Sequence, residues 1–142
     1  KEGREVLRAR GAYCAMSRAY QMAGLKPADI NVAEAHDCFS VMGALGAEVI
    51  GRAEYGRGAR YWREGKAAPD GECGINTSGG LIAKGHPIGA TGVSMMHEIA
   101  TQLRGEAGPR QVKNARLGLI ENGGGVISVE EMACGVTILE AI

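Results

Sequence analysis

The glycines of this chain are concentrated in a few places instead of being spread evenly. There are 23 glycines in 142 residues, and they cluster at 79–92 and 123–125. Because glycine has no Cβ, it allows backbone turns that other residues resist. The clusters therefore predict sharp turns with a functional role, between segments that form regular structure.

Helix-like and strand-like segments alternate along the chain. Apolar residues recur at helical spacing from Gly11 to Leu25, with Gly24 as a C-terminal stop. Two further apolar runs, 39–51 and 88–103, predict buried helices, and short apolar runs predict strands at 31–37, 116–120 and 134–139. This alternation predicts an α/β fold, a mixed β-sheet covered by helices.

The length of the chain suits one compact domain. We expect a single domain over residues 1–142, with residues 1–10 as a linker or extended lead-in. The segment 52–72 is charged, rich in glycine and without a clear period, which predicts an exposed connection with a solvated arginine face.

The charge balance excludes several classes of protein. Sixteen basic residues cancel sixteen acidic ones, so we expect neither a nucleic acid nor a membrane as partner. No apolar run approaches the roughly 20 residues of a membrane span. The four cysteines show neither CxxC spacing nor the density of a disulfide scaffold, which favours a reducing compartment. These features predict a soluble, cytoplasmic protein.

Reactive side chains gather in three loops at the boundaries of predicted elements, where α/β sheets usually build their sites. The loops are EAHDCFS (34–40), GGLIAKGHPIGATG (79–92) and IENGGGV (120–126). The second loop has neither GxGxxG spacing nor the GK[ST] ending of a P-loop, which argues against nucleotide binding.

His86 stands in the second loop under unusual backbone constraints. Pro87 favours an extended conformation at His86, and Gly85 and Gly89 allow close approach on either side. Histidine is well suited to proton transfer near neutral pH. The pattern predicts an active-site base at His86, with a purely structural turn as the alternative.

His36 and Cys38 are two residues apart, so on a regular strand they would share one face. A zinc site is one alternative, in which Cys73 would join them in space. The other alternative for Cys38 is a small buried apolar residue, the common fate of a free cysteine.

Together the three motifs resemble a known family. HDCF at 36–39, NTSGGLIAKGHPIGATG at 76–92 and a GGG turn before the last strand look like the C-terminal half of thiolases. The resemblance is closest to sterol-carrier-protein-type thiolases and acetyl-CoA acetyltransferase-like proteins, and it covers roughly Ala12 to the end. It implies a thiolase-like half. The N-terminal half, which holds the nucleophilic cysteine in the family, has no counterpart in these 142 residues.

The resemblance also implies a role for each motif residue. His86 matches the GHP histidine, which activates the nucleophilic cysteine and donates to the thioester oxygen. His36 matches a position that is asparagine in other thiolases and would hold a water at the same oxyanion site. Cys38 matches the HDCF cysteine, the acid/base for the substrate α-carbon. Gly123 would lend a backbone N–H to a second oxyanion hole.

Several implications concern the whole protein. The resemblance implies an acyl-CoA C-acyltransferase with a coenzyme A thioester as substrate, no tightly bound cofactor and no metal, inactive as this chain alone. It further implies a homodimer or tetramer, and in some relatives a small zinc-ribbon partner. A thiolase-fold aldolase acting on a coenzyme A ester and a noncatalytic lipid-carrier or structural module are the alternatives.

The chain departs from many thiolases just before the glycine turn. Glu121 and Asn122 stand where those proteins place an acid/base cysteine, which shifts that role to Cys38. We expect Cys134 in the core of the last strand. His97 and Cys14 fall within predicted helices and are assigned to packing or the surface.

Overall fold

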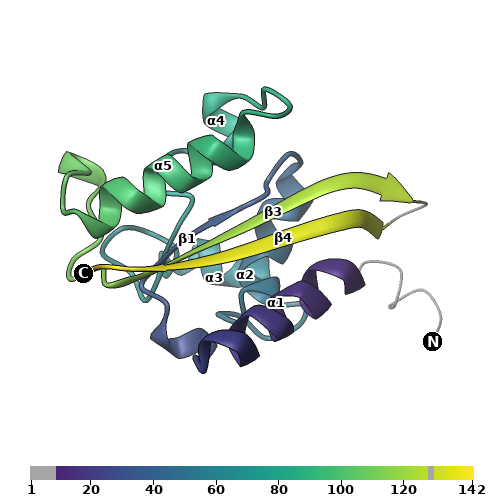
Figure 1. Cartoon of the computed structure of the whole chain (residues 1–142), viewed down its shortest axis with the longest axis horizontal. Coiled ribbons are helices and arrows are strands. Elements are labelled where there is room, and N and C mark those ends of the chain that lie inside the picture. The colour runs from purple at the N-terminus through teal and green to yellow at the C-terminus, as the bar shows by residue number, and fades with distance from the viewer. Residues whose placement is uncertain (1–8, 128–129) are drawn as a thin grey trace.

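The computed structural model describes residues 9–127 and 130–142, which form a mixed β-sheet between helical layers (Figure 1). Within these residues the strand order is β2-β1-β3-β4. β1 runs parallel to β2 and β3, whereas β4 runs antiparallel to β3. The predicted α/β class with a mixed sheet is confirmed.

The elements alternate much as the sequence predicts. The strands are β1 (Val32–Ala35), β2 (Gly74–Ile75), β3 (Leu117–Ile127) and β4 (Glu130–Glu140). The α-helices are α1 (Arg10–Ala23), α2 (Ser40–Val49), α3 (Gly58–Arg63), α4 (Gly80–Lys84) and α5 (Thr91–Leu103), and short 3-10 turns lie at η2 (Pro27–Asp29) and η3 (Gly108–Arg110). Gly24 ends α1 with a φ of 67°, a left-handed conformation that suits glycine.

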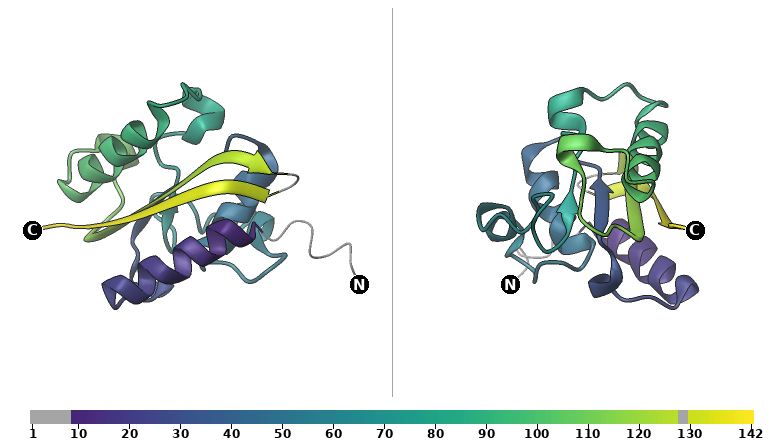
Figure 2. Two further views of the ribbon diagram at one scale, coloured as in Figure 1. Left: turned by 45° about the vertical axis from the view of Figure 1, so that its right-hand side comes forward. Right: turned by 90° about the vertical axis from the view of Figure 1, so that its left-hand side faces the viewer.

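Both faces of the sheet are covered, because successive strand side chains point to opposite faces. On one face Val32 packs against Met95 and Ile99 of α5. On the other face Ala33 belongs to a larger core that includes α1 and α2. Figure 2 shows α1 and α5 on opposite sides of the strands. Burial on both faces holds the carboxyl end of β1, where the site lies, in a rigid frame.

Two glycines allow the helices to approach the sheet closely. A Cβ at Gly118 of β3 would lie 2.4 Å from Cγ2 of Ile99 on α5. A Cβ at Gly46 of α2 would lie 2.8 Å from the Cβ of Ala35 on β1. Real Cβ atoms do not come this close, so any larger residue at these positions would force the neighbouring atoms to shift.

The segment 52–72 is more ordered than its composition predicts. It contains α3, and Tyr61 in that helix is only 4% exposed. Indole Nε1 of Trp62 donates to the carbonyl of Gly43 on α2 at 2.9 Å. The prediction of an exposed connection is therefore wrong for this part, because packing against α2 buries a helix too short to show a period.

The glycines at 123–125 do not form the predicted turn. β3 continues through them, and Gly123 and Gly124 pair with Cys134 and Ala133 of β4. Glycine is a poor strand former in isolation. Here the long antiparallel neighbour supplies backbone partners, so β3 and β4 extend well beyond the two short strands predicted at 116–120 and 134–139.

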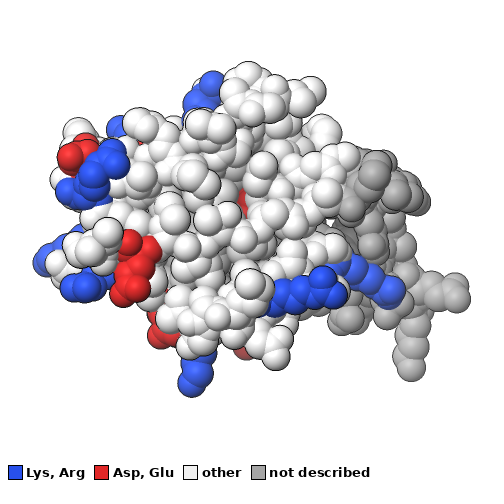
Figure 3. All heavy atoms as spheres, in the orientation of Figure 1, with Lys and Arg blue, Asp and Glu red and all other residues white. Residues whose placement is uncertain are grey.

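Residues 1–8 of the expected lead-in lie outside the described residues, whereas Ala9 is buried and Arg10 begins α1. None of the helices described from residue 9 onward is long and apolar enough to cross a membrane. On the face drawn in Figure 3, side chains of both charges lie mainly at one end and along the lower edge, and the middle is almost entirely white, with little acidic surface. This face therefore carries no broad patch of a single sign.

Candidate active site at the carboxyl end of β1

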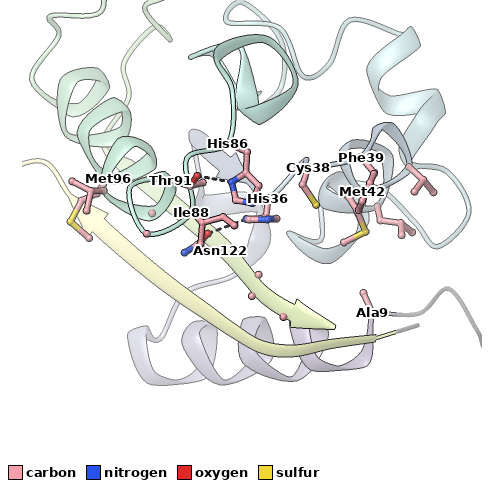
Figure 4. Close-up of a pocket in the computed structure, with 18 residues that line it drawn as sticks. Ala9, His36, Cys38, Phe39, Met42, His86, Ile88, Thr91, Met96 and Asn122 are labelled. Atoms are coloured by element: carbon pink, nitrogen blue, oxygen red, sulfur yellow. Dashed lines mark hydrogen bonds between the residues drawn. The ribbon is translucent and has the colours of Figure 1, made fainter. Parts of the chain in front are cut away.

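A pocket of about 870 Å³ opens where the three predicted loops meet (Figure 4). His36 and Cys38 enter it from the loop after β1, His86 from the loop after α4, and Gly123 from β3. The remaining wall is largely apolar and includes Phe39, Val41, Met42, Leu45, Ile88, Val93 and Met96. No Lys, Arg, Asp or Glu among the described residues lines it.

His36 and His86 are in direct contact in this pocket. Their ring centroids are 4.9 Å apart and the ring planes are nearly perpendicular, at 87°. His36 is 7% exposed, whereas His86 lies on an exposed loop. Fifty positions separate the two residues in the sequence, so the fold alone brings them together.

The tautomer of neutral His86 follows from its hydrogen bonds. Nδ1 of His86 lies 2.7 Å from Oγ1 of Thr91, and that hydroxyl donates to the carbonyl of Pro87 at 3.2 Å. In the arrangement in which the single hydroxyl proton is directed to Pro87, the oxygen accepts from Nδ1. In that arrangement Nε2 of neutral His86 carries a lone pair, as a general base requires.

His36 is oriented in a similar way by Asn122. Nδ1 of His36 lies 3.0 Å from Oδ1 of Asn122, an oxygen that can only accept. Nε2 of neutral His36 is thus also an acceptor. Gly92 makes room for this contact, because a Cβ there would lie 2.8 Å from Nδ2 of Asn122.

Cys38 is a half-buried thiol, not part of a disulfide, and it lines the same pocket as the two rings (Figure 4). β1 ends at Ala35, so His36 and Cys38 do not share the face of a regular strand as predicted. They meet at the pocket because the loop after β1 turns into α2 immediately beyond Phe39.

Gly123 presents its backbone toward the loop after β1. The carbonyl of Leu117 accepts from Asn31, on the β1 side, and the carbonyl of Arg116 accepts from Ala141, on the β4 side. Backbone groups alternate between the two neighbours along a strand. The N–H of Gly123 therefore faces the side of β3 on which β1 lies. β1 ends at Ala35 and does not extend as far as Gly123.

Carboxylates beneath the pocket hold the loops in place. Oδ1 of Asp37 accepts from the backbone N–H of Leu81 at 2.6 Å, and Oε2 of Glu121 accepts from the backbone N–H of His36 at 3.0 Å. A Cβ at Gly80 would lie 2.1 Å from Oδ2 of Asp37, so this contact requires glycine there. Burial raises the pKa of Glu34, although bonds from Ser78 and the charge of a nearby lysine oppose the shift.

Cys73 does not join His36 and Cys38 as the zinc alternative required. It is 1% exposed, belongs to the core between α1, α2 and α3, and burial raises its pKa to about 11. The described part of the chain contains no group of three or more His, Cys, Asp or Glu suited to a metal. Cys14 and His97 are exposed on α1 and α5.

Sequence reasoning did not assign roles to two residues that orient the histidines. Thr91 contacts His86, and Asn122 contacts His36. Thr91 lies inside the first glycine cluster and Asn122 directly precedes the second, a signal that was present in the sequence. Cys134, expected in the core, is half-buried and donates to Oε1 of Glu121 at 3.2 Å.

Comparison with known proteins gives consistent results. A family model described as "Thiolase C-terminal domain-like" matches residues 2–139. The acetyl-CoA acetyltransferase of Methanothermobacter thermautotrophicus is 46% identical over 122 residues, which is 86% of this chain and 32% of that protein. Human sterol carrier protein 2 is 47% identical over 116 residues, 80% of this chain and 21% of that protein.

A solved structure titled "Ltp2-ChsH2(DUF35) aldolase" has the same fold. It superimposes with a TM-score of 0.77 at 24% identity, covering 92% of this chain and 31% of the solved one. The chain thus spans a third or less of the length of the relatives it matches.

Proposed function

The chain belongs to the thiolase family as a C-terminal domain, and from this premise we propose that it forms the C-terminal part of an acyl-CoA C-acyltransferase. The observation that supports this proposal most strongly is the perpendicular contact of His36 and His86, 4.9 Å apart, at a pocket that Cys38 and Gly123 also line. The arrangement brings a base, a second imidazole, a thiol and a backbone donor to one small volume.

His86 is the proposed base for the nucleophilic cysteine, which lies outside these 142 residues. Nε2 of His86 would take the thiol proton as the thiolate attacks the substrate carbonyl. The resulting imidazolium carries a hydrogen on Nε2 and can donate it to the thioester oxygen in the following step. Thr91 supports this cycle because its bond to Nδ1 keeps the ring in the required tautomer.

His36 and Gly123 are the proposed stabilisers of negative charge on oxygen. Nε2 of His36 would accept a hydrogen from a water, whose second hydrogen points to the oxyanion. The N–H of Gly123 faces the side of β3 that β1 leaves open, which suits a second oxyanion hole. Preorganised donors of this kind typically contribute about 3 kcal/mol each to the stabilisation of a transition state.

Cys38 is the proposed acid/base at the α-carbon. When the carbon–carbon bond of a 3-oxoacyl-CoA breaks, the electron pair passes to the α-carbon of the departing thioester enolate. The thiol of Cys38 would protonate that carbon, and in the condensation direction the thiolate would remove the proton again. Its place at the pocket wall beside His36 supports this role.

The coenzyme A thioester is the proposed substrate. The described pocket wall has no Lys or Arg side chain, so the phosphates of coenzyme A would be bound outside this pocket. A homodimer or tetramer and a zinc-ribbon partner remain predictions from the resemblance, and a cytoplasmic location remains a prediction from the composition. Light scattering of the purified complete protein tests the oligomeric state.

The decisive experiment is His86→Ala in the complete protein that contains this chain, assayed for thiolysis of a 3-oxoacyl-CoA. We expect kcat to fall by about 10³-fold, in the range of lost general acid–base catalysis. His97→Ala is the matched control, since His97 is exposed on α5 away from the pocket lining.

A parallel assay with a 3-hydroxyacyl-CoA, the kind of substrate that retro-aldol cleavage requires, separates the alternatives. Thiolytic cleavage consumes one free coenzyme A thiol per turnover, whereas retro-aldol cleavage consumes none. Full activity of His86→Ala would contradict the catalytic assignment and favour a noncatalytic module.

A further inference from the structure

Two contacts between the same two segments follow one another along the chain. Lys84 forms an ion pair with Glu34, with Nζ 3.2 Å from Oε2. Two residues further along each segment, His86 contacts His36. The ion pair and the pair of imidazoles are thus two successive contacts between the segment at the end of β1 and the segment at the end of α4.

The ion pair is part of a three-residue cluster with Ser78. Oγ of Ser78 donates to Oε2 of Glu34 at 2.7 Å and accepts from Nζ of Lys84 at 2.6 Å. The backbone N–H of Ser78 donates to Oε1 of Glu34 at 3.3 Å. The Glu34 side chain is 0% exposed and the Lys84 side chain 23%, so water screens the cluster weakly.

The backbone around His86 needs such a cluster to hold one position. α4 has five residues, too few for a stable isolated helix. Glycines with positive φ flank it, namely Gly79 at 98° and Gly85 at 92°. Because glycine resists few backbone rotations, the chain on either side of α4 does not itself determine where His86 lies.

Side chains from the end of β1 therefore hold α4 at both ends. Asp37 accepts from the N–H of Leu81 in the first turn, and Glu34 binds Lys84 in the last. The second of these contacts, at Lys84, lies two residues before His86. Only Gly85 separates Lys84 from His86, and its N–H donates to the carbonyl of Leu81 at 3.0 Å, so a shift of Lys84 would be transmitted to the imidazole.

We propose that Glu34, Ser78 and Lys84 form a brace that sets the separation of His36 and His86, and that Lys84 and Glu34 are therefore positioning residues for the reaction. The proposal rests on the proposed function, because positioning matters only if the two imidazoles act together. The brace touches neither ring and none of its residues lines the pocket.

Lys84→Met in the complete protein is the main test. The substitution keeps an unbranched side chain that is one atom shorter and removes its charge. We expect kcat to fall by about 10- to 100-fold, the effect of misplacing a catalytic group by roughly 1 Å, with KM changed less than twofold. Lys84→Arg, which restores the cation, should recover kcat to within about threefold of the original protein by preserving that alignment.

Arg110→Met is the matched control. Arg110 also pairs with a buried glutamate, Glu98, but the pair lies at the far end of α5 from the pocket. It should lower stability without changing kcat by more than about twofold, because no positioning contact is lost. The double variant Glu34→Gln, Lys84→Met should have a kcat no lower than that of Lys84→Met alone, because both substitutions remove the same ion pair.

The results separate failure of the brace from failure of the proposed function. If His86→Ala abolishes activity while Lys84→Met leaves kcat unchanged, the brace is wrong and the function stands. An equal fall of kcat in Lys84→Met and Arg110→Met also overturns the brace. If Lys84→Met does not fold, Ser78→Ala replaces it, and unchanged kcat in Ser78→Ala overturns the proposal.

Discussion

Two buried glutamates of this domain are held by neighbouring residues of one segment but differ in their electrostatics. Thr77 donates to Glu98 on α5 at 3.0 Å, and the next residue, Ser78, donates to Glu34 on β1 at 2.7 Å. Each glutamate also has one cationic partner. Yet the pKa of Glu98 is lowered and the pKa of Glu34 is raised.

The difference follows from the number and geometry of donors. Burial alone would raise the pKa of Glu98, but Arg110 contacts both carboxylate oxygens at 3.0–3.1 Å and Gln102 adds another bond. Glu34 is more deeply buried and receives one ammonium from Lys84, so the cost of desolvation prevails. The cluster at the far end of α5 stabilises the fold, whereas the cluster beside the pocket sets its geometry at some cost in stability.

The largest effect on stability is expected for Arg110→Met. It leaves the carboxylate of Glu98 buried without its bidentate partner, which should lower the free energy of unfolding by about 2 kcal/mol. The value is below that of a fully enclosed pair because the Arg110 side chain is 45% exposed. Urea unfolding at pH 7 measures it, and a loss no larger than that of an exposed Arg104→Met control would contradict the comparison.

Lys84→Met should destabilise less, by about 1 kcal/mol at pH 7, because Glu34 can take up a proton once its cation is removed. The deficit relative to the original protein should shrink as the pH is lowered toward 5. Parallel urea series at the two pH values test this, and a deficit that does not shrink on acidification would contradict it.

Thr77→Val should cost about 0.5–1 kcal/mol, since it removes one hydrogen bond to a carboxylate that keeps three other donor groups. Gln102 and Arg110 still bind Glu98 in this variant. Thermal unfolding with Thr77→Ser as the matched control, in which the hydroxyl is retained, separates the lost bond from lost packing.

The smallest effect is a change in how stability depends on pH, with opposite sign at the two glutamates. A lowered pKa means that the contribution of Glu98 is present above the ordinary value of 4.5 and is lost as the pH falls through its folded value. A raised pKa means that the contribution of Glu34 is present below 4.5 and is lost as the pH rises through its folded value.

Glu98→Gln should therefore remove stability that the original protein gains as the pH rises through the folded pKa of Glu98. Glu34→Gln should remove a loss that the original protein suffers above pH 4.5. Unfolding free energies measured from pH 3 to pH 7 check both slopes. Changes in slope of the same sign in the two variants, each taken relative to the original protein, would refute the assignment.

Much of this architecture was predictable from local patterns. Helical periodicity and the stop at Gly24 located α1 to within two residues at each end, and strand-like runs indicated β1 and the mixed sheet. The helix α3 was missed because six residues show no period, and Tyr61 in it is buried only through contact with α2. The extension of β3 through its glycines was missed because their pairing depends on β4.

The sequence by itself determined which groups are present for chemistry: His36, Cys38 and His86 stand in motifs whose order indicates a thiolase C-terminal domain. Only the tertiary structure decided that the two imidazoles touch, that Thr91 and Asn122 orient them, and that Cys73 lies apart in the core. The reason is physical. Local patterns specify backbone preference and burial, whereas contacts between positions 50 residues apart depend on how β1, α4 and β3 pack together.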